Sequence, residues 1–342
     1  MTTLTPNPHI SLIATVLNEG ASIDRLLDSL AMQTRVPDEI IIVDGGSRDD
    51  TVVRMVSWAK ALPLTVIESP GCNISQGRNR AIEQVTGEIL VITDAGVRLA
   101  NDWLEKLVQP LLEDSSVGVA AGFFRADPHT VFEAAMGATV LPLEDEIDAA
   151  SFLPSSRSVA MRTSLAKQVS GYPEWLDYCE DLIFDLRLKL LDAKFAFVPS
   201  AVVDFRPRGS LRAFYKQYYL YARGDGKADL WRKRHAIRYI TYLVALPILL
   251  VLAIAVHPAF WLLLLIGGGI YLRQPYRRLP TIMQRAPRKD ALAWLYAIAL
   301  IPVIRIVGDV AKMIGYPVGW RWRLTNHLPD WREVQTNRMT IP

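Results

Sequence analysis

Apolar and polar positions alternate in blocks along the first hundred residues. Four short runs rich in Ile, Val and Leu, at residues 10–16, 40–43, 64–67 and 88–93, are separated by stretches whose apolar residues recur at helical spacing. Unbroken apolar runs of this length predict strands that are buried on both faces. Strands joined by helices are parallel, with right-handed crossovers. The pattern therefore predicts an α/β fold of the doubly wound type with a mostly parallel sheet.

The connecting segments predict helices over residues 22–30, 51–61 and 75–85, the first capped by Ser22. Further along, the pattern indicates a helix from Trp103, a strand over 117–124, a helix over 182–191 and two short strands at 195–198 and 202–205. The acidic residues 142–148 show no regular spacing, so we expect a loop there.

The pattern changes after residue 238. Residues 239–256 and 259–272 are uncharged and mostly apolar, which predicts a helical hairpin in a membrane. Basic residues flank both runs, which favours the cytoplasmic side for both ends, and Tyr239, Tyr242 and Trp261 suit interfacial belts. A third apolar run begins at residue 291 and is followed by Arg305, Asp309 and Lys312 on one helical face. We expect a re-entrant or interfacial helix there, with a third full span as the alternative.

Composition adds limits to this picture. The chain has 342 residues, of which 51% are hydrophobic, and a net charge of +3, so nothing in its overall charge suggests a nucleic-acid partner. Its two cysteines fit a reducing compartment, and residues 1–8 lack the pattern of a signal peptide. We expect a cytoplasmic domain at residues 1–230 on the inner or plasma membrane. Membrane-associated helices would follow at 231–320 (hairpin 239–272, third helix 291–316), and a polar tail at 321–342.

Polar side chains follow the predicted strands. Asn18, Asp44 and Asp94 lie where three strands end, and the carboxyl edge of an open α/β sheet is where ligands bind. The first turn, Asn18-Glu19-Gly20, has neither a G-x-G-x-x-G nor a Walker A pattern, which disfavours a dinucleotide or NTPase site. Acids at strand ends instead suit a nucleoside diphosphate bridged by a divalent cation.

Five short motifs occur in order: Asn18-Glu19, Val43-Asp44-Gly45-Gly46-Ser47 with Asp49 and Thr51, Gly77-Arg78-Asn79, Thr93-Asp94-Ala95-Gly96, and Glu180-Asp181. Over roughly residues 9–226 this series resembles the family 2 inverting glycosyltransferases, which have the GT-A fold. Within the family, residues 217–226 and the apolar second half are most similar to membrane-anchored exopolysaccharide-type enzymes.

The resemblance implies a role for each motif. Thr15, Glu19 and Asp44 would bind the nucleoside, and Arg78 would lie by the phosphates. Asp94 would ligate Mg²⁺ or Mn²⁺, and Asp181 would take the proton from the acceptor hydroxyl, with Glu180 beside it. Arg206 and Arg223 would contact a lipid-linked diphosphate or the donor phosphates, or would face lipid headgroups. The other candidate substrate contacts are Asn18, Gly45, Ala95, Arg157 and Gln217.

Two positions depart from the family pattern. The second acid of the usual Asp-x-Asp is replaced in Asp94-Ala95-Gly96, so a metal would depend more on the diphosphate and water. The Gln-x-x-Arg-Trp of processive synthases is absent at Gln217, which favours the addition of one sugar. The partners implied are a nucleotide-diphosphate sugar, a polyprenyl- or lipid-linked acceptor, and the membrane.

Simpler interpretations stay open for several residues. Asp44 could close an Asx turn, Arg78 could be a solvated helix residue, Glu19 an ordinary first-turn acid, and Asp181 a helix N-cap. Two other functions also remain: a sugar nucleotidyltransferase, which the Asn18-Glu19 turn disfavours, and a non-catalytic scaffold that binds nucleotide-sugar. The sequence predicts most strongly a membrane-anchored, metal-dependent inverting glycosyltransferase.

Overall fold

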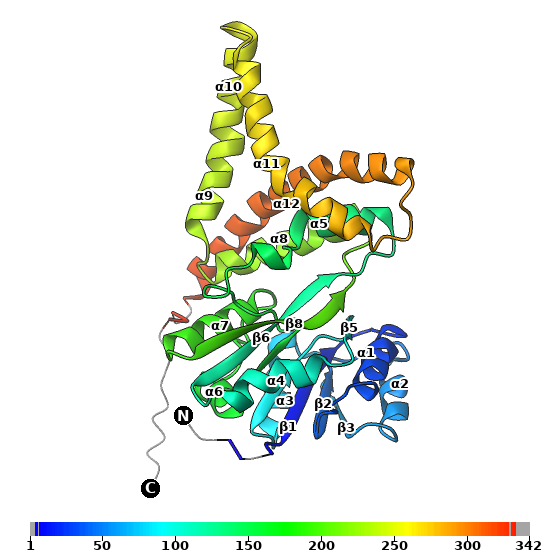
Figure 1. The fold of residues 1–342 in the computed structure, drawn as a ribbon. Coiled ribbons are helices and arrows are strands. Elements are labelled where there is room, and N and C mark those ends of the chain that lie inside the picture. The colour runs from blue at the N-terminus through cyan, green and yellow to red at the C-terminus, as the bar shows by residue number, and fades with distance from the viewer. Residues whose placement is uncertain (1–3, 6, 328–329, 333–342) are drawn as a thin grey trace. The chain divides into compact units, whose positions relative to one another are not determined.

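The computed structural model describes residues 4–5, 7–327 and 330–332 (Figure 1). The chain forms two compact units. The first contains residues 1–125, 144–205 and 329–342, and the second contains residues 126–143 and 206–328. The predicted tail at 321–342 and the start of the chain at 1–8 lie in part outside the described residues.

The first unit is built on one eight-stranded sheet, among the residues described, with the strand order β3-β2-β1-β4-β7-β6-β8-β5. β3, β2, β1 and β4 are parallel, as the sequence predicts. β7 pairs antiparallel with β4 and β6, and β5 pairs antiparallel with β8, so the complete sheet is mixed. The strands are β1 (Ile10–Val16), β2 (Glu39–Asp44), β3 (Leu64–Glu68), β4 (Ile89–Ile92), β5 (Val97–Leu99), β6 (Val117–Ala126), β7 (Val159–Arg162) and β8 (Lys194–Phe205).

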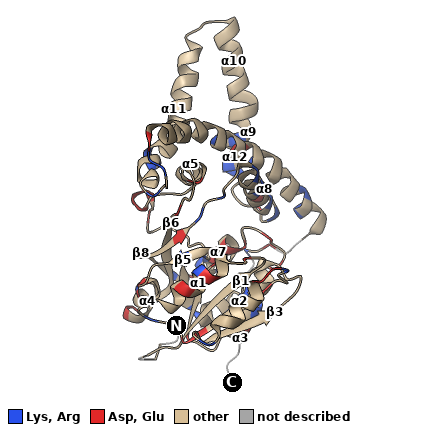
Figure 2. Cartoon of the chain, turned by 90° about the vertical axis from the view of Figure 1, so that its right-hand side faces the viewer, with Lys and Arg blue, Asp and Glu red and all other residues tan. Residues whose placement is uncertain are grey.

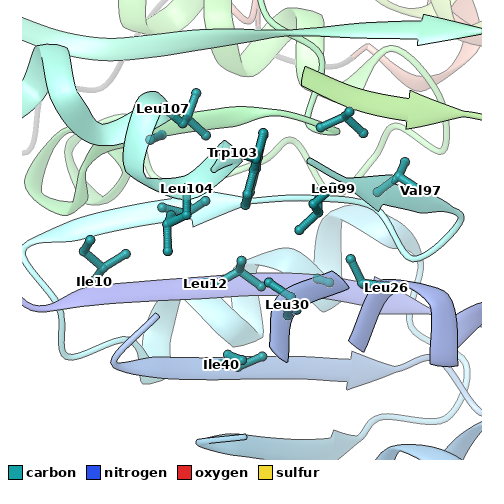
Figure 3. Close-up of a cluster of buried hydrophobic side chains, with 14 of the residues drawn as sticks. Ile10, Leu12, Leu26, Leu30, Ile40, Val97, Leu99, Trp103, Leu104 and Leu107 are labelled. Atoms are coloured by element: carbon teal, nitrogen blue, oxygen red, sulfur yellow. The ribbon is translucent and has the colours of Figure 1, made fainter. Parts of the chain in front are cut away.

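Alternate residues of the central strands pack on opposite faces of the sheet. Leu12 of β1 joins a core that includes Leu26, Leu30 and Trp103 (Figure 3), whereas the next residue, Ile13, joins a separate core on the other side. Both residues are fully buried. A strand covered on both faces needs an unbroken apolar sequence, which is why the short runs identified these strands.

The helices of the first unit are α1 (Ser22–Ala31), α2 (Thr51–Trp58), α3 (Ile74–Gln84), α4 (Trp103–Glu113), α6 (Thr163–Gln168) and α7 (Glu180–Leu190). The predicted cap at Ser22 is wrong: Ala21 holds the N-cap position, and the Ser22 hydroxyl donates to the Glu19 carbonyl at 2.5 Å. The two short strands expected at 195–198 and 202–205 are one continuous strand, β8. The acidic stretch is mostly irregular, as expected, with a single 3-10 turn at Glu144–Glu146.

The second unit is helical. Its elements are α5 (Val131–Val140), α8 (Leu211–Lys227), α9 (Arg232–Ile240), a π-helical turn (Thr241–Ala245), α10 (Leu246–Ala255), α11 (Phe260–Met283) and α12 (Ala291–Asn326). α10 and the first part of α11 lie side by side as a hairpin (Figure 1). Both apolar runs of the predicted hairpin are therefore helical, and the third run belongs to one long helix.

Two helices among the described residues are long and apolar enough to cross a membrane: Arg232–Ala255, which combines α9, the π-helical turn and α10, and Ala291–Asn326. Only 6% of the apolar window of the first is buried within the chain, whereas a core helix of a soluble domain would be mostly covered. Figure 2 shows that Lys and Arg gather around α9, α8 and α12, and that the far end of the hairpin carries no charge.

The backbones of α8 and α12 come into direct contact. A Cβ atom on Gly226 would lie 2.3 Å from the Tyr316 carbonyl oxygen, and one on Gly319 would lie 2.0 Å from the Arg223 carbonyl oxygen. Only glycine permits this approach, which is a known way for apolar helices to associate. A third apolar core forms where α5, α11 and α12 pack together.

Candidate active site

The first strand-to-helix turn is held by the second. The Asn18 backbone N–H donates to Ser47 Oγ at 2.8 Å, and Asn18 Oδ1 accepts from the Arg48 N–H at 2.9 Å. Thr51 Oγ1 accepts from the backbone N–H groups of Glu19 and Gly20. Asn18 has a left-handed φ of 55°, a conformation that asparagine tolerates better than most residues. The motif residues that follow β1 and β2 therefore form one interlocked edge.

Asp44 lies at the end of β2 and is 1% exposed. Its Oδ2 accepts from the N–H groups of Gly46 and Ser47 at 2.9 and 2.8 Å, and its Oδ1 accepts from the Ser47 hydroxyl at 2.5 Å. This is the Asx-type turn that the sequence left open as the simpler interpretation. In this structure the carboxylate shapes the backbone of Gly45–Ser47, and it does not project from the edge.

Arg78 lies on α3 and is nearly fully buried, with a side chain 2% exposed. Its Nη2 donates to Asp94 Oδ1 at 2.9 Å, and its Nη1 donates to Glu180 Oε1 at 2.8 Å. The guanidinium also lies 4.9 Å from the centre of the Tyr172 ring. A solvated position for Arg78 is thus wrong. The buried arginine joins the acid that follows β4 to the acid that opens α7.

Arg157 approaches the other side of Asp94. Its Nε lies 3.5 Å from Asp94 Oδ2, and its guanidinium stacks 4.4 Å from the centre of the Phe205 ring. The Asp94 side chain is 28% exposed and that of Arg157 is 19% exposed. Of the two arginines beside Asp94, Arg157 is the one that solvent reaches. The carboxylate is consequently flanked by a buried cation and a partly exposed one.

The loop before α7 is tied to α3 by the residue next to Arg78. Asn79 Oδ1 accepts from the Tyr172 N–H at 2.7 Å, and its Nδ2 donates to the Tyr172 carbonyl at 2.9 Å. Tyr172 stacks on Phe184 with ring centres 4.2 Å apart and hydrogen-bonds Ser156. Tyr172 was not among the site residues predicted from the sequence. The aromatic pair fixes the start of α7 against the arginine.

Asp181 lies in the first turn of α7 and is partly exposed. The N-cap interpretation is wrong, because Cys179 holds the cap position with a left-handed φ of 66°. Asp181 Oδ1 instead accepts from the adjacent Leu182 N–H at 2.8 Å. A carboxylate in the first helical turn also interacts favourably with the helix dipole. The left-handed cap turns the chain so that Glu180 is buried while Asp181 keeps contact with solvent.

Two neighbouring acids have perturbed pKa values. Burial, and then the charge of Asp181, raise the pKa of Glu180 to about 7 despite the opposing effect of Arg78. Burial and the same charge hold the pKa of Asp185 well above its usual range, and Asp185 Oδ2 has no hydrogen-bond partner among the described residues. Perturbed acids gathered around a partly exposed carboxylate are typical of an active site. Asp185, which shares a helix face with Asp181, was not predicted from the sequence.

Three predicted substrate contacts lie in the second unit. Arg206 forms an ion pair at 2.9 Å with Glu133, whose side chain is 1% exposed. Gln217 donates to the Tyr221 hydroxyl at 2.7 Å, and Arg223 lies on the same helix, α8. Arg206 therefore has a structural partner within its own unit, which the sequence did not indicate.

Asp94, the predicted metal ligand, is not surrounded by other described side chains that could coordinate a metal ion. Both oxygens of Asp94 face guanidinium groups, and Ala95 and Gly96 offer no side-chain ligand. Across residues 4–5, 7–327 and 330–332, no group of three or more His, Cys, Asp and Glu side chains is arranged to hold a metal ion. Mg²⁺ and Mn²⁺ prefer several oxygen ligands. The residues present do not fit a metal held by the protein alone.

Comparison with known proteins identifies the family to which the first part of the chain is similar. Residues 11–152 match glycosyl transferase family 2, a span that includes the strand ends at Asn18, Asp44 and Asp94. Residues 11–152 form a family 2 glycosyltransferase domain. The glycosyltransferase is 24% identical over 227 residues to the O-antigen chain rhamnosyltransferase RfbN of Salmonella typhimurium, covering 61% of this chain and 70% of that protein. It is 32% identical over 108 residues to the glycosyltransferase AglE of Haloferax volcanii, covering 30% of this chain and 36% of that protein.

A solved structure extends the likeness to the fold. The mannosyltransferase PcManGT from Pyrobaculum calidifontis, in complex with GDP-Man and Mn²⁺, superposes with a TM-score of 0.54 and 20% identity, covering 94% of this chain and 88% of that chain. The predicted family and the GT-A fold are confirmed. The family match and the similarity to RfbN support sugar transfer as the activity.

Proposed function

We propose that the glycosyltransferase moves one sugar from a nucleotide-diphosphate sugar to the hydroxyl of a lipid-linked acceptor at a membrane, with inversion at the anomeric carbon. The observation that carries the proposal is the chain of contacts Asp94–Arg78–Glu180 that ends beside Asp181. One buried guanidinium joins Asp94, the acid expected beside the donor, to Glu180, the chain neighbour of the candidate base Asp181. Such a rigid link keeps the reacting groups at a constant separation.

Asp181 acts as the general base in this mechanism. Its carboxylate takes the proton of the acceptor hydroxyl as the oxygen attacks the anomeric carbon. The bond from that carbon to the diphosphate oxygen breaks, and its electron pair leaves with the nucleoside diphosphate. Asp181 retains contact with solvent, so an acceptor can reach it. General-base assistance of this kind contributes about 10²–10⁴-fold to the rate.

The donor would lie along the edge formed by Thr15, Asn18, Glu19 and the Gly45–Ser47 turn, which Asp44 shapes. Arg157 supplies the partly exposed positive charge that a diphosphate requires, while Arg78 holds Asp94 and Glu180 in place. A divalent cation would accompany the donor, bound mainly by phosphate oxygens and water, with Asp94 as its protein carboxylate.

The membrane part of the proposal rests on Arg232–Ala255 and Ala291–Asn326 and on the basic residues that flank the apolar runs. By positive-inside bias the catalytic domain would face the cytoplasm. Arg206, Gln217 and Arg223 lie on the segments that lead to the apolar helices, which suits them to acceptor or headgroup contacts. The absence of Gln-x-x-Arg-Trp at Gln217 favours transfer of a single sugar.

The experiment is release of nucleoside diphosphate by the detergent-purified protein. UDP-, GDP- and dTDP-sugars are tested with Mn²⁺ or EDTA, with and without a polyprenyl-linked acceptor, and the anomeric configuration of the product is determined by NMR. The proposal is supported if one donor releases nucleoside diphosphate, if the lipid acceptor stimulates this release, and if the anomeric configuration of the product is inverted. Nucleotide binding without release from any donor would favour the scaffold, and pyrophosphate release from a nucleoside triphosphate and a sugar phosphate would favour a nucleotidyltransferase.

A further inference from the structure

A buried carboxylate joins three helices of the second unit. Asp309, on α12, has a residue exposure of 8%. Its Oδ1 accepts from Arg238 Nε on α9 at 2.8 Å, and its Oδ2 accepts from the hydroxyls of Tyr242 and Tyr271 at 3.1 and 2.6 Å. Tyr242 belongs to the π-helical turn, a feature that is frequent at functional sites. Tyr271 belongs to α11, so the carboxylate links every long apolar segment of the unit.

More positive than negative charge surrounds Asp309. Lys312 Nζ lies 4.0 Å from Asp309 Oδ1, and the Arg305 guanidinium lies 4.8 Å from the centre of the Tyr271 ring. Arg305 makes no ion pair with any residue that the structure describes, and its buried Nε has no hydrogen-bond partner. The neighbouring acid on α8, Asp225, pairs with His235 at 3.1 Å. Among the described residues, Arg238 and Lys312 thus form ion pairs with the same carboxylate, Asp309, and Arg305 lies beside the tyrosine that donates to it.

The surroundings of this cluster are apolar. Exposed side chains next to it along the same helices are Ile240, Leu243, Val244, Ile306 and Val310. An arginine without an anionic partner is costly in such a setting, and charged residues in membrane segments commonly mark a functional site. A bound anion would satisfy Arg305. An anion that carries its own apolar chain would also cover the exposed Ile and Val side chains.

We propose that Arg305 and Lys312 bind the phosphate or diphosphate group of a membrane lipid, whose hydrocarbon chain lies along the apolar surface of α12. Arg238 neutralises Asp309 at 2.8 Å, and Tyr242 and Tyr271 hold that carboxylate in place, so the charge of Arg305 and the more distant Lys312, at 4.0 Å, remains for the lipid. Arginine and lysine are the usual phosphate-binding residues, and basic clusters between membrane helices bind lipid headgroups in this way. The inference rests on the proposed function, because that function places these helices in a membrane.

The test uses the full-length protein in detergent, with a polyprenyl phosphate as the probe and tryptophan fluorescence as the readout. The double variant Arg305→Gln/Lys312→Gln should bind the probe at least about tenfold more weakly than the unmodified protein does, since each cation makes a charge-assisted contact. Arg305→Lys keeps the charge and should retain most of the binding. Arg321→Gln, at an exposed position of the same helix, is the matched control and should bind as the unmodified protein does.

Competition identifies the ligand. Phosphatidylglycerol should displace the probe, and inorganic phosphate at equal concentration should not. Displacement by inorganic phosphate alone would show a site for free phosphate and overturn the lipid assignment, as would equal binding by the double variant and the unmodified protein. Thermal unfolding of each variant confirms that it is folded. Weaker probe binding by the double variant, in a protein that transfers no sugar, would support this inference although the proposed function fails. Sugar transfer by the unmodified protein, with equal probe binding by the double variant, would support the proposed function and overturn this inference.

Discussion

The two units hold buried charge in opposite ways. In the first unit one arginine, Arg78, lies between two carboxylates and against an aromatic ring. In the second unit one carboxylate, Asp309, lies among three cations and two tyrosine hydroxyls. The first cluster, which includes Asp181, has an excess of acid and suits the removal of a proton. The second has an excess of positive charge and suits the binding of a phosphate. The same residue types therefore support different chemistry according to which sign is in excess.

The largest effect is expected for a change of Asp181, the candidate base of the acid-rich cluster. Asp181→Asn removes the base and keeps the size of the side chain, so transfer should fall by about 10²–10⁴-fold. Donor affinity should stay the same, because the contacts of Asp94 and Arg78 are preserved. Nucleoside diphosphate release and equilibrium binding of the donor measure the two quantities. An equal loss of both would count against Asp181 as the base.

A second prediction concerns the centre of the same cluster. Arg78→Met leaves Asp94 and Glu180 without their buried cation, which should lower the free energy of unfolding by about 3–5 kcal/mol. Arg54, whose side chain is 37% exposed, also bridges two acids, Asp24 and Asp50. Arg54→Met should cost far less, because exposed ion pairs contribute little to stability. Denaturant unfolding of both variants makes the comparison, and equal losses would contradict the importance of burial.

The third prediction concerns Glu180, which contacts Arg78 and directly precedes Asp181 in the chain. The pKa of Glu180 is raised to about 7 from its ordinary value of 4.5, so its charge changes near neutral pH. Ionised Glu180 adds negative charge beside Asp181 and strengthens it as a base, so the rate should rise with pH and show an inflection near 7. Glu180→Gln should remove this inflection. A rate profile of the variant that still bends at the same pH would assign the titration to another group.

The same shift affects stability in a defined direction. Because folding raises the pKa of Glu180, the carboxyl group binds its proton more tightly in the folded state. Its contribution to stability is complete below pH 4.5 and is lost as the pH rises toward 7. The free energy of unfolding of the unmodified protein should therefore fall across this window relative to that of Glu180→Gln.

The smallest expected effect tests the incomplete metal motif. A Cβ on Gly96 would meet nothing within 4 Å, so Gly96→Asp can be introduced without a clash. The new acid restores Asp-x-Asp, and Mn²⁺ should then stimulate transfer more than it does in the unmodified protein, within about tenfold. Gly96→Asn has the same size without the charge and is the control. Equal stimulation of all three proteins would show that position 96 has no access to the cation.

The sequence was most informative where burial dictated composition. β1 and β4 are inner strands of the sheet and pack on both faces, so their apolar runs could be recognised without any structure. The motif residues at the strand ends were equally predictable, because parallel strands bring their carboxyl ends to one edge. The antiparallel half of the sheet was less visible, since β8 is only partly buried and contains a proline.

Contacts between distant segments could not be predicted. Glu180 is 102 residues from Arg78 in the chain, and spacing along α3 gives no indication that α7 covers this arginine. Asp44 posed the opposite difficulty, because the same Asp-Gly-Gly-Ser sequence suits a ligand contact and a closed turn. Tyr242 suited an interfacial belt, yet its hydroxyl donates to Asp309, which is 67 residues away. Each case depended on which side chains the fold brings together.

The placement of α5 has a practical consequence for anyone who wishes to prepare the catalytic part alone. The helix belongs to the stretch between β6 and β7, yet its buried residues, among them Ala134, Ala135 and Met136, pack in one core with Leu279, Ile282 and Ala297. A protein shortened at residue 230 would keep α5 and lose α11 and α12, which cover it. The newly exposed apolar surface would favour aggregation. A soluble version requires redesign of the outer face of α5 together with any truncation.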